Sequence, residues 1–144
     1  MKITKCLLFS TLFMLTMCGM AFGSGATFRI SAVGAKLSQP NDENAEIPTY
    51  QLKTTVGQAI TLVADGIVIP RGQGPMPGDI DAGAWLFDDE AFKLVPTAHA
   101  KGDKTKSVIM LEPLKAATKT RVRFVGDILG RYQKFDVIVE VAEK

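Results

Sequence analysis

Five acidic side chains on either side of the only tryptophan, Trp85, are the first candidates for chemistry in this chain. They are Asp79, Asp81, Asp88, Asp89 and Glu90. Carboxylate oxygens gathered in this way are the ligands that calcium prefers. The spacing differs from that of an EF-hand loop, and neighbouring residues of a strand point to opposite faces of a sheet. We therefore predict no metal site here.

Two further candidates for chemistry are a glycine pair and a histidine. Gly72-x-Gly74 resembles the start of a dinucleotide-binding loop, but Pro77 stands where the third glycine belongs, and no helix pattern follows. His99 is the only histidine, and no serine of the chain lies in a recognisable nucleophile motif. From these residues we expect a non-enzymatic protein without a cofactor.

Residues 1–23 have the three parts of a secretory signal peptide. Lys2 and Lys5 precede an apolar run that is shorter than the roughly 18 residues of a membrane-spanning helix. The small-x-small triplet Ala21-Phe22-Gly23 then supplies a cleavage site. We expect export to the periplasm or the extracellular space, and a single domain at residues 24–144 that does not insert into a membrane.

Both cysteines of the chain, Cys6 and Cys18, fall inside this segment. The residues around Cys18 resemble a bacterial lipobox, but Met17 stands where that motif wants a small residue, which argues against lipid anchoring. The chain after residue 23 therefore has no thiol for a disulfide, a metal site or nucleophilic catalysis.

The net charge of the expected domain is zero. Lys2 and Lys5 are two of the 17 basic residues, so residues 24–144 carry 15 basic and 15 acidic side chains. Nucleic-acid binders carry clustered basic residues, and a polybasic patch is needed for anionic membranes. We expect neither partner.

Short segments with the period-two alternation of strands fill most of residues 24–144. Glu112 to Ala117 is the single place where we expect a short helical turn. The strand segments are Thr27 to Ala32, Tyr50 to Ala64, Ala84 to Val95 as two strands or one bent strand, Ser107 to Leu111, Thr120 to Val125 and Lys134 to Val141. Asp65-Gly66 is a strong turn signal that ends the second of these. Ser107 to Leu111 is apolar on both faces, as a strand between two layers would be, and the last segment has Phe135, Val137, Val139 and Val141 on one face. The fold class is therefore all-β, an immunoglobulin-like antiparallel β-sandwich of about seven strands, with the polar residues 38–49 as a loop or linker.

Two segments, Thr55 to Gly66 (TVGQAITLVADG) and Thr118 to Val141, resemble bacterial immunoglobulin-like domains. In that family a V-G-Q turn leads into the second strand, and two alternating strands close the sheet. The resemblance implies that Trp85 is the central aromatic residue of a sandwich.

The order of strands and loops also resembles the chagasin-like inhibitors of papain-type proteases, which present three loops to the protease cleft. On that resemblance the loops are Ile80 to Trp85, Ala100 to Thr105 and Gly126 to Gly130, although the inhibitory loop motifs of the family are not matched. A chagasin-like cysteine protease inhibitor is therefore one alternative function.

The stretch RGQGPMPGDIDAGAW, from Arg71 to Trp85, combines prolines that restrict the backbone with glycines that allow positive φ. A loop shaped in this way favours an interaction module that binds a protein or glycan partner. Alternatively, its apolar residues fold back over the end of the sandwich beside Trp85. The predicted partner-binding loop is Ile67, Ile69, Arg71, Met76, Asp79, Asp81 and Trp85, and the second and third end loops add Lys101, Asp103, Lys104, Asp127, Ile128 and Leu129.

A second alternative is a structural subunit of an envelope or surface assembly. Its first strand would pair with another copy by β-augmentation, with residues 38–49 as the hinge. The residues predicted for this self-association are Thr27, Phe28, Arg29, Ile30, Ser31 and Ala32.

Overall fold

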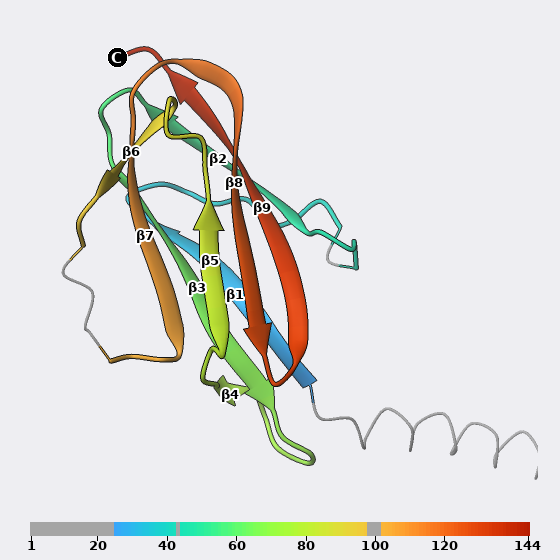
Figure 1. The fold of residues 1–144 in the computed structure, drawn as a ribbon. Coiled ribbons are helices and arrows are strands. Elements are labelled where there is room, and N and C mark those ends of the chain that lie inside the picture. Colours follow the sequence, from blue (N-terminus) through green and yellow to red (C-terminus); the bar gives the residue numbers. More distant parts are fainter. Residues whose placement is uncertain (1–24, 43, 98–101) are drawn as a thin grey trace, which may run out of the picture.

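The computed structural model describes residues 25–42, 44–97 and 102–144, which form two packed β-sheets (Figure 1). The strands are β1 (Gly25–Val33), β2 (Thr49–Thr55), β3 (Ile60–Ile69), β4 (Met76–Pro77), β5 (Ala82–Leu86), β6 (Phe92–Val95), β7 (Lys106–Pro113), β8 (Ala117–Ile128) and β9 (Arg131–Ala142). The predicted signal peptide, His99 and Lys101 lie outside the described residues. Within the described residues, no helix is long and apolar enough to cross a membrane.

Sheet A has the order β1-β3-β7-β6, with β4 paired to the end of β3, and sheet B has the order β2-β9-β8-β5. This arrangement is that of an immunoglobulin sandwich, so the predicted fold class is confirmed. One pairing departs from the antiparallel rule, because β2 runs parallel to β9. The described chain has nine strands instead of about seven, since β4 is an extra two-residue strand and β5 and β6 belong to different sheets.

The core lies between the sheets and follows the predicted alternation. Phe135, Val137, Val139 and Val141 of β9 all face inward and are buried. Phe28 of β1 reaches the other sheet, where its ring lies 5.0 Å from the Phe124 ring in an edge-on arrangement. The alternating pattern of β9 therefore identified its buried face correctly.

The prediction that Asp65-Gly66 ends a strand is wrong, because β3 continues to Ile69. The Gly66 N–H donates to the Thr105 carbonyl at 2.8 Å, and the Gly66 carbonyl accepts from the Gly78 N–H at 2.9 Å. Long-range hydrogen bonds thus keep this Asp-Gly pair extended, overriding a strong local turn signal.

Two predictions about connections are also corrected. Glu112 to Ala117 contains no helical turn, because Glu112 and Pro113 pair with β6 as the end of β7. The polar segment 38–49 runs along the outer edge of β2, where the Ser38 N–H donates to the Gln51 carbonyl at 2.8 Å. Its first residues therefore cover a sheet edge, which a free hinge would leave open.

Candidate functional site

Three connections between strands gather at one end of the sandwich (Figure 1). We call this surface the loop end and define it as residues 70–81, the described residues 102–105, and the turn 129–130. The first connects β3 to β5, the second leads into β7, and the third joins β8 to β9. Described residues from each of the three predicted loops therefore lie at this end.

Backbone hydrogen bonds tie these connections to one another. The Ile80 N–H donates to the Lys104 carbonyl at 2.8 Å, which joins the first connection to the second. The Leu129 N–H donates to the Asp81 carboxylate Oδ2 at 2.9 Å, which joins the third to the first. These bonds hold the parts of the three connections nearest the strands together, which reduces the conformational entropy lost when a partner binds there.

Two glycines let the first connection pass close over β3. A Cβ built on Gly66 would collide with the Gly78 carbonyl oxygen, and one on Gly78 would collide with Cγ1 of Val68. By contrast, a Cβ on Gly74, nearer the tip, would meet no atom within 4 Å. Gly66 and Gly78 therefore set the position of the loop, and Gly74 does not.

The turn between β8 and β9 holds an exposed leucine in an unfavourable conformation. Leu129 has φ of 53° and Gly130 has φ of 72°, the pattern of a type I′ hairpin turn, which favours Asn-Gly. Leu129 is the one residue other than glycine with positive φ among the described residues. Its exposed fraction is 66%. Neither backbone preference nor burial explains a leucine here, and such strain concentrates at functional sites.

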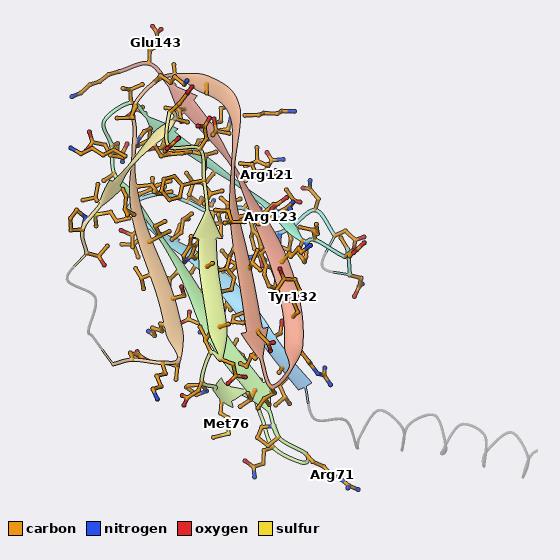
Figure 2. All side chains as sticks on the ribbon, in the orientation of Figure 1. Arg71, Met76, Arg121, Arg123, Tyr132 and Glu143 are labelled. Atoms are coloured by element: carbon orange, nitrogen blue, oxygen red, sulfur yellow. The ribbon has the colours of Figure 1, made fainter. Side chains whose placement is uncertain are left out.

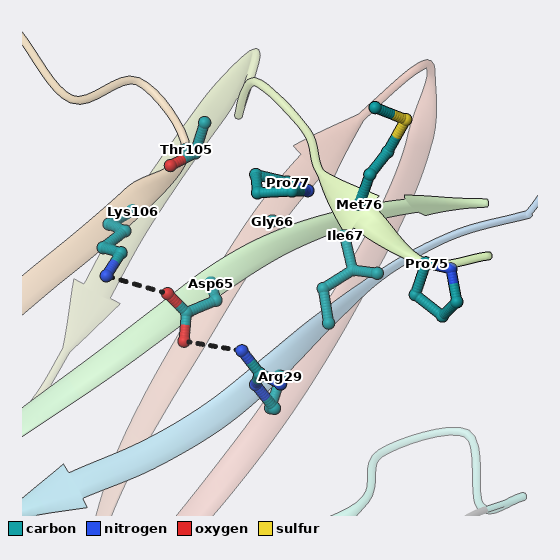
Figure 3. Close-up of a pocket in the computed structure, with 9 residues that line it drawn as sticks. All are labelled: Arg29, Asp65, Gly66, Ile67, Pro75, Met76, Pro77, Thr105 and Lys106. Carbon is teal, nitrogen blue, oxygen red and sulfur yellow. Dashed lines mark ion pairs between the residues drawn. The ribbon is translucent and has the colours of Figure 1, made fainter. Parts of the chain in front are cut away.

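A shallow pocket of about 240 Å³ lies beside the loop end, between the first connection and sheet A (Figure 3). Asp65 sits at its floor, between Arg29 of β1, at 3.8 Å, and Lys106 of β7, at 3.7 Å. The two cations are much more exposed than the carboxylate, with side-chain exposed fractions of 70% and 47% against 17%. One carboxylate faces two cations, so the pocket has an excess positive charge.

The opposite wall of this pocket is apolar. Ile67, Pro75, Met76 and Pro77 line it, with Met76 45% exposed. Proline at 75 and 77 has few backbone conformations and no N–H to satisfy. The pocket therefore offers a stiff apolar wall facing two cationic side chains.

The structure separates the residues predicted for the binding loop. Arg71 and Met76 project from the loop end, as Figure 2 shows, and Asp79 and Asp81 are also exposed. Ile67 and Ile69 belong to β3 and face outward on sheet A. Trp85 packs into the sandwich, with its ring 4.9 Å from that of Phe124 and its indole N–H donating to Ser107 Oγ at 3.1 Å.

The third loop is shorter than predicted, whereas the described residues of the second lie in a connection as expected. Asp103 and Lys104 lie in the second connection, where Asp103 accepts the Thr105 N–H at 3.0 Å. Asp127 and Ile128 are the last residues of β8, and Ile128 is fully buried, which corrects its assignment to a contact surface. Of the third predicted loop, only Leu129 and Gly130 form the turn.

The strand predicted for self-association, β1, pairs with β3 over its whole length. Phe28 and Ile30 are buried in the core, while Thr27, Arg29, Ser31 and Ala32 are more accessible. The outer edge of β1 is partly covered, because the Gln133 side-chain amide donates to the Ala26 carbonyl at 2.9 Å. Extending β1 toward another copy would remove Phe28 from its aromatic contacts.

Sequence reasoning missed Asp65, Thr105 and Lys106 as residues of the pocket. Interpreting Asp65-Gly66 as a turn hid the fact that Asp65 pairs with Arg29 on one side and Lys106 on the other. No rule on sequence spacing would have found the group of Arg29, Asp65 and Lys106, because strand registers bring these residues together. Within the described residues, no group of three potential metal ligands was found.

No protein family and no curated protein matches the chain. Among solved structures, it is similar to a chimeric titin Z1Z2 functionalized with a KLER exogenous peptide from decorin, at 10% sequence identity and a TM-score of 0.40. The match covers 79% of this chain and 99% of the titin chimera. A similarity this low says nothing about function.

Proposed function

We propose that this protein is an exported, non-enzymatic binding module that holds a protein partner at its loop end. The observation that carries the proposal is Leu129, an exposed leucine in a strained turn. A leucine at such a position lowers the stability of the fold, and burial of its side chain against a partner would offset this loss. Export follows from the pattern of residues 1–23, with Lys2 and Lys5 before an apolar run.

The chemistry of the loop end favours a protein over a glycan. Glycan sites commonly offer aromatic rings for stacking, and the residues that line the pocket include none. Methionine and proline side chains instead fit apolar side chains of a protein, and methionine adapts to irregular surfaces. The cations Arg29 and Lys106 would select a segment in which an apolar group lies next to a carboxylate.

The experiment places a photoreactive amino acid at position 76 and, as a matched control, at position 114. Met76 and Leu114 are nearly equally exposed, at 45% and 46%, but Leu114 lies in the connection between β7 and β8, at the opposite end of the sandwich. After expression of the whole chain in its native cell and irradiation, we expect a discrete crosslinked product from position 76 only. Equal products from both positions, or none from position 76, would refute the proposal.

A chagasin-like inhibitor of papain-type proteases is a second candidate, favoured by the gathering of three connections at one end. The shortness of the third connection, Leu129 and Gly130 alone, departs from that family's pattern and limits its reach into a cleft. Titration of papain with the purified protein tests this candidate. Full protease activity at micromolar concentrations of the protein would exclude it.

A further inference from the structure

The outer face of sheet A carries apolar side chains that are only partly buried by the described residues. On β7, Ile109 and Leu111 face the core, so Val108 and Met110 face outward. The sequence predicted a strand with two apolar faces, as in a strand between two layers, and the described chain supplies a layer on one side only. Among the described residues, no second layer packs on this face.

Strand registers show that these side chains form one continuous patch. One row across the sheet runs Val33, Thr61, Met110 and Val95, and the next runs Ser31, Val63 and Val108. We call the apolar members of the two rows the apolar face: Val33, Val63, Val95, Val108 and Met110. Between β6 and β7 it is hollowed by a shallow pocket of about 340 Å³.

Sheet B has a different outer face. Arg121, Arg123 and Tyr132 project from it along β8 and β9 (Figure 2). Arg123 donates to Asp136 through Nε at 2.6 Å and Nη2 at 2.8 Å, and this hydrogen bond raises the pKa of Arg123. Lys53 pairs with Glu140 at 3.5 Å. The outer face of sheet B thus carries paired charges among its outward residues, whereas the two central rows of sheet A carry no charged residue.

Charges at the two ends of the apolar face identify its occupant. On β7, Lys106 lies three residues before Ile109 and Glu112 lies three residues after it, both on the outer face. Consider two copies that meet face to face, related by a two-fold axis that runs perpendicular to the strands and passes β7 at Ile109. The two β7 strands are then antiparallel, and each Lys106 lies opposite the Glu112 of the other copy. Val108 then lies opposite Met110 of that copy.

We propose that the outer face of sheet A binds a second copy of this chain in this antiparallel, face-to-face arrangement. Packed sheets cross at about 30°, which displaces residues about 10 Å from the axis by roughly 5 Å. Lysine and glutamate side chains span such an offset. This proposal does not rest on the proposed function. The two share Lys106, which also lines the pocket, but the dimer is tested by self-association and not by capture of a partner.

The dimer is weak. Four strands spaced about 4.8 Å apart and six residues of about 3.4 Å each give an interface of roughly 400 Å² per copy, half the usual area. We expect a dissociation constant on the order of 10 to 100 µM. The lysine–glutamate pairs lie at the rim, so affinity falls as salt concentration rises.

Analytical ultracentrifugation of the purified protein, after expression of the whole chain, measures this equilibrium from about 5 µM to 1 mM. Lys106→Glu and Glu112→Lys, each alone, should weaken the dimer about tenfold, because like charges then face each other. The double variant should bind more tightly than either single variant, although residue 106 then lies beside Asp65 and residue 112 beside Lys93 in the same sheet. A monomer throughout the series, or a double variant that binds no more tightly than the single ones, would overturn the proposal.

An uncharged pair of variants guards against misfolding of the charge variants. Val108→Thr keeps the side-chain shape but makes the apolar face more polar, and should weaken the dimer several-fold. Val125→Thr, on the outer face of sheet B, makes the same change away from the interface. Equal effects of the two substitutions would show that association does not use sheet A and would also overturn the proposal.

Discussion

Replacing Leu129 with asparagine should make the protein more stable and abolish partner binding. A left-handed conformation costs an ordinary L-residue roughly 1–2 kcal/mol, and asparagine tolerates it better. Asn-Gly is also the preferred pair for a type I′ turn. The bond from the residue 129 N–H to Asp81 is made by the backbone, so the substitution leaves it in place. We expect the free energy of unfolding to rise by about 0.5–1.5 kcal/mol.

Leu129→Ala separates the two effects of this substitution. Alanine removes the leucine side chain but retains the cost of positive φ, so it should lose partner binding without a gain in stability. Trp85 is the only tryptophan, and its packing against Phe124 makes its fluorescence a direct probe of urea unfolding. With a slope of about 1.5 kcal/mol per molar urea, the asparagine variant should unfold at a urea concentration higher by roughly 0.3–1 M.

Two results would refute this reasoning. If Leu129→Asn unfolds at the same urea concentration as the wild type or lower, the turn is not strained by its leucine. If both variants still give the crosslinked product from position 76, Leu129 is not an anchor for the partner. Either result would remove the observation that carries the proposed function.

Two further substitutions test the packing that supports the site. Gly78→Ala should lower the free energy of unfolding by about 1–3 kcal/mol, because the new Cβ collides with a β3 valine. Gly74→Ala, where a Cβ meets no atom, should change it by less than about 0.5 kcal/mol. Urea unfolding measures both variants, and equal losses of stability would contradict the close approach of Gly78 to β3. Asp136→Asn should lower the free energy of unfolding by about 1–3 kcal/mol, since it disrupts a bidentate pair with Arg123. Glu140→Gln should lower it by only about 0–0.5 kcal/mol, because the Lys53 partner is 80% exposed. Thermal unfolding compares this second pair, and a larger loss at Glu140 would show that burial does not rank these ion pairs.

Local pattern predicted the strands best where one face is buried. The alternation from Lys134 to Val141 predicted the core-facing side of β9. The resemblance to bacterial immunoglobulin-like domains placed Trp85 in the sandwich, where it packs, although Trp85 was also assigned to the partner-binding loop. Local signals failed at Asp65-Gly66, where hydrogen bonds to residues far along the chain keep the backbone extended. The resemblance to chagasin-like inhibitors assigned Ile128 to a loop, although this residue is buried at the end of β8.

The sequence by itself determined the all-β class and the alternation of most strands, because both depend on residues next to one another in the chain. It also predicted three loops, and described residues from each of them lie at one end of the sandwich. Only the tertiary structure decided how Arg29, Asp65 and Lys106 meet, since strand registers fix contacts between distant segments. Likewise, the strain at Leu129 exists only because two paired strands leave a two-residue turn between them.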